Sequence, residues 1–67
     1  MDDLEDLLLT TAEVAAMTRA PQSTVRYWRH LGQGPASFRL GRRVVYRRHE
    51  VLRWLREKES AEAALTG

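Results

Sequence analysis

Apolar and polar positions at the start of the chain follow the pattern of a short, capped helix. Thr10 followed three residues later by Glu13 is the pattern of a capping box, so a helix is predicted to begin here. The helix is predicted to end near Thr18. Val14 and Met17 are expected to form its inward stripe, and Ala15 and Ala16 are small enough to allow close packing by another helix.

A second helix is predicted from Pro21 to about Leu31, after a turn over residues 18–20. Proline suits the first position of a helix because its missing N–H has no intrahelical partner there. Gly32, Gly34 and Pro35 then end the helix. At 100° per residue, the side expected to face a core carries Thr24, Val25, Trp28 and Leu31. The opposite side is polar and basic, without a carboxylate: Gln22, Ser23, Arg26, Arg29 and His30.

The spacing of apolar residues changes in residues 37–47, where two strands are predicted. Residues 37–40 and 44–47 would form a hairpin with Gly41-Arg42-Arg43 at its tip. A three-residue loop would pair Phe38 with Tyr46 and Leu40 with Val44. The other face would then carry Arg39, Val45 and Arg47. A slip of one residue would reverse these faces, because successive side chains alternate across a sheet.

A third helix is predicted to begin between Arg48 and Glu50 and to run through the low sixties. Its apolar face would be formed by Val51, Leu52, Trp54 and Leu55, and its charged residues alternate in sign, as on a solvated helix face. Residues 60–67 are expected to be a helical extension or a frayed tail, and residues 1–7 a flexible acidic arm. The folded domain is therefore predicted to span residues 8–59.

Charge is distributed very unevenly along this sequence. Residues 14–49 contain eight arginines and no carboxylate, so the net charge of +2 conceals a strongly basic middle between acidic ends. A dense field of one sign favours binding to a phosphate backbone. The alternative is a solvated basic surface, but ordinary protein surfaces intersperse both signs.

Composition argues against several other classes of function. The chain has no cysteine and only two histidines, so neither a disulfide nor a metal site is expected. No nucleophile lies beside a base and no glycine-rich phosphate loop is present, so neither an enzyme nor a cofactor is expected. No apolar stretch approaches the ~18 residues of a membrane span, and the acidic start does not resemble a signal peptide. We therefore expect a cytoplasmic protein.

The predicted elements combine into a mainly α fold with a small β-hairpin, a winged helix-turn-helix. Two short helices joined by a tight turn form the helix-turn-helix, the hairpin forms a two-stranded wing, and the third helix closes the domain. An α-helix fits the major groove of DNA, where arginine contacts guanine well. A narrow hairpin tipped with arginines suits the neighbouring minor groove.

These residues resemble the MerR-type winged helix-turn-helix, and in particular the small excisionases of temperate phages, notably of actinobacteria. The resemblance covers about residues 8–57. It is carried by three stretches: Leu9-Thr10-Thr11-Ala12-Glu13-Val14-Ala15, Ser23-Thr24-Val25-Arg26-Tyr27-Trp28 and Phe38-Arg39-Leu40-Gly41-Arg42-Arg43-Val44-Val45-Tyr46. Full MerR regulators continue into a coiled coil and an effector-binding region. Since this sequence ends at Gly67, we expect no small-molecule effector.

The resemblance and the charge pattern together indicate which residues contact DNA. The recognition helix is expected to use Gln22, Ser23, Thr24, Arg26, Tyr27, Arg29 and His30. For Thr24 and Tyr27 both phosphate contact and core packing remain open, whereas Trp28 and Trp54 are expected in the core. The wing is expected to use Arg39, Arg42, Arg43 and Arg47, with Arg19 and Arg48 as further contacts to the DNA backbone. Arg53, Arg56 and Lys58 are expected to pair with nearby glutamates.

These observations lead to one principal functional hypothesis and two alternatives. The resemblance implies an excisionase, a recombination directionality factor that binds the attachment region of a phage, bends the DNA cooperatively with other copies and acts with an integrase. The first alternative is a small MerR-like transcriptional regulator. The second is an adaptor whose basic face binds an acidic protein.

Overall fold

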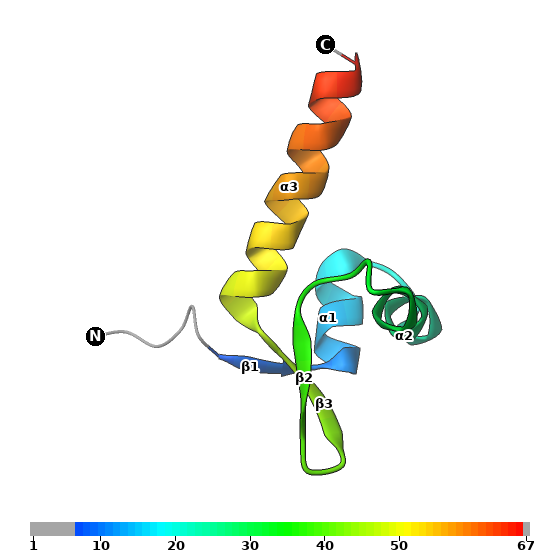
Figure 1. Cartoon of the computed structure of the whole chain (residues 1–67), viewed down its shortest axis with the longest axis vertical. Coiled ribbons are helices and arrows are strands. Elements are labelled where there is room, and N and C mark those ends of the chain that lie inside the picture. The colour runs from blue at the N-terminus through cyan, green and yellow to red at the C-terminus, as the bar shows by residue number, and fades with distance from the viewer. Residues whose placement is uncertain (1–6, 67) are drawn as a thin grey trace, which may run out of the picture.

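The computed structural model describes residues 7–66, and side chains for residues 7–64. Its elements run in the order β1 (Leu8–Thr10), α1 (Thr11–Thr18), α2 (Gln22–Leu31), β2 (Ser37–Leu40), β3 (Arg43–Arg47) and α3 (Arg48–Thr66). Three helices surround one side of a small antiparallel sheet, and the β2–β3 hairpin extends beyond them (Figure 1). This arrangement confirms the predicted winged helix-turn-helix.

The capping box at the start of α1 is present as the sequence predicted. The Thr10 hydroxyl accepts a hydrogen bond from the Glu13 amide at 3.1 Å, and the Thr10 amide donates to the Glu13 carboxylate at 2.8 Å. Two amide N–H groups that have no acceptor within the helix therefore have side-chain acceptors. The helix ends at Arg19, whose left-handed backbone (φ 58°) turns the chain towards α2.

The second helix begins one residue later than predicted, at Gln22, with Pro21 as its N-cap. Proline makes no side-chain cap, so the exposed start of α2 has no side-chain acceptor of its own. After α2 the chain crosses close to the helix at Gly34. A Cβ atom on that residue would lie 3.0 Å from the Cβ of Trp28, so any larger residue would force the loop or the helix to shift and glycine is favoured.

The sheet has the strand order β1-β3-β2, and the register between β2 and β3 differs from the prediction by one residue. Phe38 pairs with Val45 and Ser37 with Tyr46, whereas we expected Phe38 opposite Tyr46. The reason is that the turn has two residues, not three. Gly41 (φ 65°) occupies its first position, as in a type II′ hairpin turn, and Arg43 already belongs to β3. The predicted faces of the hairpin were therefore wrong.

The first strand was missed by the sequence prediction. Leu8–Thr10 pairs antiparallel with β3, and Leu9 lies opposite Tyr46. The carbonyl of Leu7 also accepts a hydrogen bond from the Arg48 amide at 2.8 Å, so Leu7 is attached to the fold and does not belong to a free arm. The remainder of the predicted arm, residues 1–6, lies outside the described residues.

The core lies between the sheet and the three helices. It is formed by buried residues from five elements: Leu9, Val14, Ala15, Val25, Tyr46 and Val51. Two expectations about the helix faces were wrong. Ala16 is exposed although Ala15 is buried, and Leu31 is 43% exposed because it lies at the end of α2, beyond the core.

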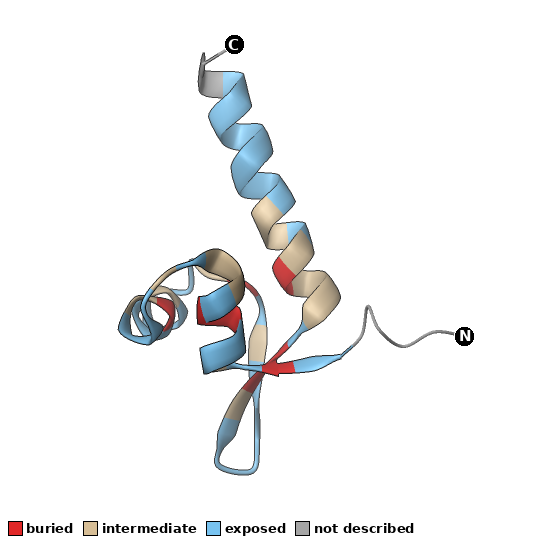
Figure 2. Cartoon of the chain, turned by 180° about the vertical axis from the view of Figure 1, so that it is seen from behind, coloured by how far each residue is buried: buried red, intermediate tan, exposed pale blue. Residues whose placement is uncertain are grey.

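The last helix divides into a packed half and a projecting half. Val51 is fully buried, and Leu52, Trp54 and Leu55 are half-buried, as expected. From Arg56 to Ala64 every residue is exposed, and this half projects from the domain on the side away from the hairpin (Figures 1 and 2). Residues 60–66 continue the helix, so the extension is helical. Within the described residues, no helix combines the length and apolar character needed to cross a bilayer.

Candidate nucleic-acid interface

The exposed face of α2 carries most of the predicted recognition residues. Six of the seven are exposed to solvent: Gln22, Ser23, Arg26, Tyr27, Arg29 and His30. Thr24 is half-buried, and Val25 faces the core. Tyr27 is 59% exposed, so core packing is excluded and its hydroxyl is available to a ligand. The polar face predicted from the sequence is therefore an open surface.

Arg26 is restrained by its own helix. A terminal nitrogen of its guanidinium donates a hydrogen bond to the Gln22 side-chain oxygen, at 3.1 Å. The two residues are four positions apart, where side chains on a helix are neighbours. This contact orients both side chains along the exposed face, and a base edge that binds either one would compete with it.

Arg29 is held by a different element. Its Nε donates to the hydroxyl of Ser37, the first residue of β2, at 2.9 Å. Because Ser37 pairs with Tyr46 across the sheet, this bond places the charge of Arg29 near the Tyr46 hydroxyl, where it acts to lower the pKa of that tyrosine. The recognition helix and the base of the wing are thus joined by a side-chain hydrogen bond.

The Tyr46 hydroxyl is the buried polar group of this region. Tyr46 is 1% exposed, and its hydroxyl lies beside Thr11 but has no hydrogen-bond partner of good geometry among the described residues. Burial raises the pKa of Tyr46 above its ordinary value, and the charge of Arg29 and the side chain of Thr11 oppose that rise. Burial favours the neutral form of the phenol, because it penalises the charged form.

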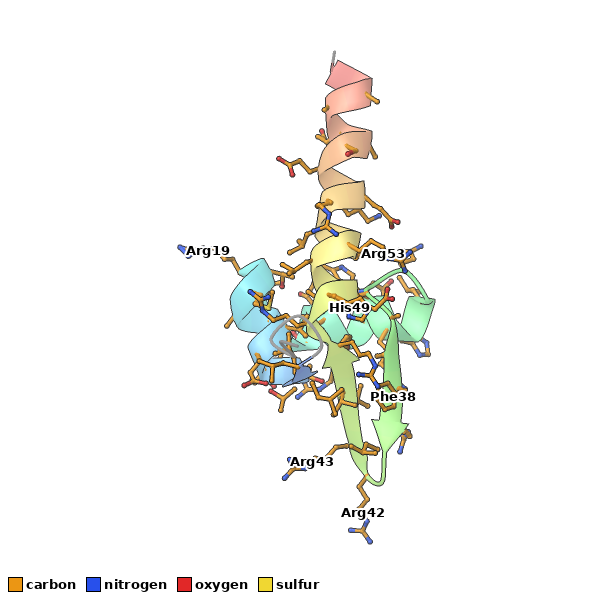
Figure 3. The ribbon with its side chains drawn as sticks, turned by 90° about the vertical axis from the view of Figure 1, so that its left-hand side faces the viewer. Arg19, Phe38, Arg42, Arg43, His49 and Arg53 are labelled. Atoms are coloured by element: carbon orange, nitrogen blue, oxygen red, sulfur yellow. The ribbon has the colours of Figure 1, made fainter. Side chains whose placement is uncertain are left out.

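The wing presents its arginines at and near the tip of the hairpin. Arg42 occupies the turn and points away from the domain, while Arg43 projects towards the side on which α1 lies (Figure 3). Arg39 is exposed on β2, on the same face of the sheet as Ser37 and Tyr46. Nothing in a hairpin tip requires two arginines for folding, so their exposure is consistent with a role in binding.

The remaining basic candidates lie apart from this tip. Arg47 lies on the opposite face of the hairpin from Arg39, with its guanidinium 5.8 Å from the centre of the Phe38 ring. Arg48 is half-buried at the start of α3. Arg19 lies at the far end of α1 from the wing tip (Figure 3). Arg47 thus shares a face of β3 with Arg43 but lies at the other end of the strand from the turn, whereas Arg19 and Arg48 lie on other elements.

A shallow groove connects the beginnings of the helices with the wing. It is lined by residues from the start of α1, the start of α2 and the beginning of β3: Thr10, Thr11, Ala12, Gln22, Arg43 and Val44. The groove brings Gln22 of the recognition helix and Arg43 of the wing to one concave surface. The sequence predicted these two residues on separate elements but did not indicate that they share one surface with Thr11.

Among the described residues, most acidic side chains lie away from this surface, whereas the Glu13 carboxylate bonds Thr10, which lines the groove. Glu13 is engaged in the capping box, and Glu50 bonds Arg53 on the same helix. The pKa of Glu50 lies below its ordinary value, chiefly because of the hydrogen bond from Arg53. The other acidic residues described lie on the projecting half of α3: Glu57, Glu59 and Glu62. Among residues 7–64, no group of potential ligands could hold a metal ion.

The expected local pairing on α3 is found in part. Arg53 pairs with Glu50, which confirms the expectation for this arginine. Lys58 instead lies with its ammonium group 5.7 Å from the centre of the Trp54 ring. The cation–π contact covers one face of that ring and keeps the charge at the surface.

Comparison with known families identifies this architecture. A family model described as a helix-turn-helix domain matches residues 8–59, from the first strand into the third helix. Comparisons with curated proteins and with solved structures found no match. The match covers most of the chain and includes the exposed face of α2 and the wing. The chain therefore belongs to the helix-turn-helix domain family, and this membership supports binding to double-stranded DNA.

Proposed function

We propose that the protein is an excisionase, a DNA-bending recombination directionality factor that acts with a phage integrase. The observation that carries the DNA-binding part is the pairing of two carboxylate-free arginine surfaces, the exposed face of α2 and the wing tip. The excision role rests on the resemblance of these stretches to small phage excisionases. The protein would act in the cytoplasm of a bacterial host, bound to DNA.

In this proposal α2 enters the major groove and reads base edges. Arg26 and Arg29 supply the forked donors that suit guanine, and Gln22 supplies an amide that suits adenine. Ser23 and His30 lie on the same exposed face and contact bases or the adjoining sugar–phosphate backbone. Thr24 and Tyr27, at the margins of that face, bind phosphates.

The wing contributes affinity more than sequence preference. Arg42 and Arg43 reach the neighbouring minor groove, and Arg39 contacts the flanking backbone. Arg47, Arg19 and Arg48 are assigned weaker backbone contacts because they lie away from the wing tip. Each phosphate neutralised by an arginine releases counterions, so these contacts make affinity strongly dependent on salt.

Bending explains how so small a protein could control recombination. Bending 20–30 base pairs by 40–90° costs about 1–6 kcal/mol, which contacts along the bent duplex offset. Several copies on neighbouring sites would share this cost and would bind cooperatively. The bent region would then let an integrase assemble the excision complex.

A mobility-shift titration tests this function. The probes are attachment-region DNA from the element that encodes the protein, a promoter fragment from the same element and random duplex, all at one physiological salt concentration. Stepwise cooperative shifts confined to the attachment region, with the anomalous mobility of bent DNA, are the expected result. A single shift confined to the promoter would replace the excisionase by a transcriptional regulator. No preference among the probes would favour the adaptor that binds an acidic protein.

Self-association is tested separately on the same DNA. We propose that either residues 1–6 or the helical extension after Ser60 contacts a neighbouring copy, because each is acidic or exposed and the surface of the neighbour is basic. Deletion of residues 1–6 should reduce the cooperativity of the titration if the acidic arm is responsible. Unchanged cooperativity would remove the arm from the proposal.

A further inference from the structure

The hydrogen bond between Arg29 and Ser37 connects two elements that would meet different parts of a DNA duplex. Arg29 lies on the exposed face of α2, and Ser37 is the first residue of the wing strand β2. The bond runs from Nε of Arg29 to the Ser37 hydroxyl, over 2.9 Å. It is a contact between side chains eight residues apart, so helical spacing alone does not produce it.

The atom that makes this contact determines what Arg29 can still do. A guanidinium has five N–H donors in a planar fork, and the bond to Ser37 occupies the one on Nε. Both terminal nitrogens therefore remain available for a bidentate contact to a base edge. Arg26 differs, because its contact to Gln22 already uses a terminal nitrogen.

Ser37 is a fixed anchor for this arrangement. It is half-buried, and its partner across the sheet is Tyr46, which is almost fully buried in the core. The position of the serine hydroxyl therefore follows the sheet and not a mobile loop. A planar fork fixed at Nε loses freedom to rotate before DNA arrives, so less conformational entropy is lost on binding.

We propose that Ser37 is a positioning residue for sequence recognition: its hydroxyl orients the guanidinium of Arg29 towards a base pair in the major groove. Ser37 itself need not touch DNA. The inference rests on the proposed recognition role of α2, and it makes the wing strand part of the sequence-reading apparatus. The base pair read by Arg29 should then depend on a residue outside the recognition helix.

The experiment begins by letting the intact protein select its preferred sequence from a randomised duplex library at fixed salt. Affinities are then measured for that sequence, for its single-base-pair variants and for random duplex. The variants are Ser37→Ala, Ser37→Thr, Arg29→Ala and the Ser37→Ala/Arg29→Ala double variant. Arg56→Lys, which keeps the charge at an exposed position of α3 away from the wing, is the control.

The expected result is a loss of discrimination at one base pair. Ser37→Ala should lower affinity for the selected sequence by about three- to tenfold, the range of one hydrogen bond, with random duplex and the salt dependence unchanged. Ser37→Thr keeps the hydroxyl and should restore discrimination. In the Arg29→Ala background, Ser37→Ala should have no further effect, because its action passes through the arginine.

Three outcomes would overturn the inference. Discrimination by Ser37→Ala equal to that of the control Arg56→Lys would remove Ser37 from recognition. Equal losses on selected and random DNA, with a lower midpoint of urea unfolding, would make the serine merely structural. Failure of the intact protein to select any sequence would overturn both this inference and the proposed function, whereas the first two results leave the proposed function standing.

Discussion

The indole rings of Trp28 and Trp54 lie with their centroids 5.1 Å apart and their planes tilted by 45°. Trp54 also donates its ring N–H to the carbonyl of Gln33, at 3.0 Å. Trp28 lies on the inner side of α2 and Trp54 on α3, while Gln33 follows the end of α2. Helix α3 therefore supports the recognition helix from behind and also holds the loop that leads to the wing.

Substitution of Trp54 should separate these two contributions. Trp54→Phe keeps an aromatic ring beside Trp28 but removes the bond to Gln33, so the free energy of unfolding should fall by about 1 kcal/mol. Trp54→Ala removes both contacts and should cost about 3 kcal/mol, at the lower end for such changes because the residue is half-buried. Urea unfolding followed by circular dichroism measures both values. Equal stabilities of the two variants would show that the aromatic contact with Trp28 adds nothing beyond the hydrogen bond to Gln33.

Arg26→Ala should change sequence preference more than general affinity. If Arg26 reads a base, discrimination at one base pair should fall by about 1–3 kcal/mol, while binding to random duplex changes little. Competition titrations with single-base-pair variants of the selected sequence provide the measurement. A uniform loss on every duplex would instead assign Arg26 to the phosphate backbone.

Arg42→Ala and Arg43→Ala should each weaken binding to all sequences similarly. Each change removes one charge near the DNA backbone, so the slope of log affinity against log salt should become shallower by about one. Arg56→Ala is the matched control, because it removes the same charge from an exposed position on α3. The wing assignment would fail if the Arg42→Ala/Arg43→Ala double variant retained the affinity and salt slope of this control.

At neutral pH the Tyr46→Phe variant should be as stable as the intact protein or slightly more stable. The hydroxyl is buried without a partner of good geometry, and its removal relieves a desolvation cost. Burial raises the pKa of Tyr46 from the ordinary 10.0, so the folded state holds this proton more tightly than the unfolded state. Stability should therefore fall as pH rises above about 10, and Tyr46→Phe should reduce that fall. Parallel urea titrations at pH 8 and above 10 make the comparison; identical pH dependence in both proteins would show that Tyr46 does not contribute.

Local signals in the sequence were sufficient to predict all three helices. The Thr10–Glu13 capping box and the glycines after Leu31 act within a few residues, and the structure confirms the boundaries of α1 and α2 to within about one residue. Helix α3 begins where predicted but extends to Thr66, beyond the predicted low sixties. The hairpin was also predicted, but its register was not. Arg43 extends β3 and leaves a two-residue turn, and no local pattern distinguished this from a three-residue loop.

Features that depend on tertiary contacts could not be predicted. Leu8–Thr10 reads as an apolar run before a helix, and it becomes a strand only because β3 offers a free edge. The contact between Arg29 and Ser37 likewise needs the tertiary fold to place α2 beside the start of β2. The candidate residues of α2 could be identified because helical periodicity alone separates the exposed face from the core face.

The position of β3 between β1 and β2 has a consequence for the order of folding. The β2–β3 hairpin can close early, since its two-residue turn joins neighbouring segments. Pairing of β1 with β3 must instead close a loop that contains both helices of the helix-turn-helix. The entropy lost on closing a loop grows with its length, so this pairing forms more slowly. During synthesis on the ribosome, Tyr46 must be added to the chain and must emerge before Leu9 can pair with it. The helices and hairpin would therefore form first, and β1 would join the sheet last.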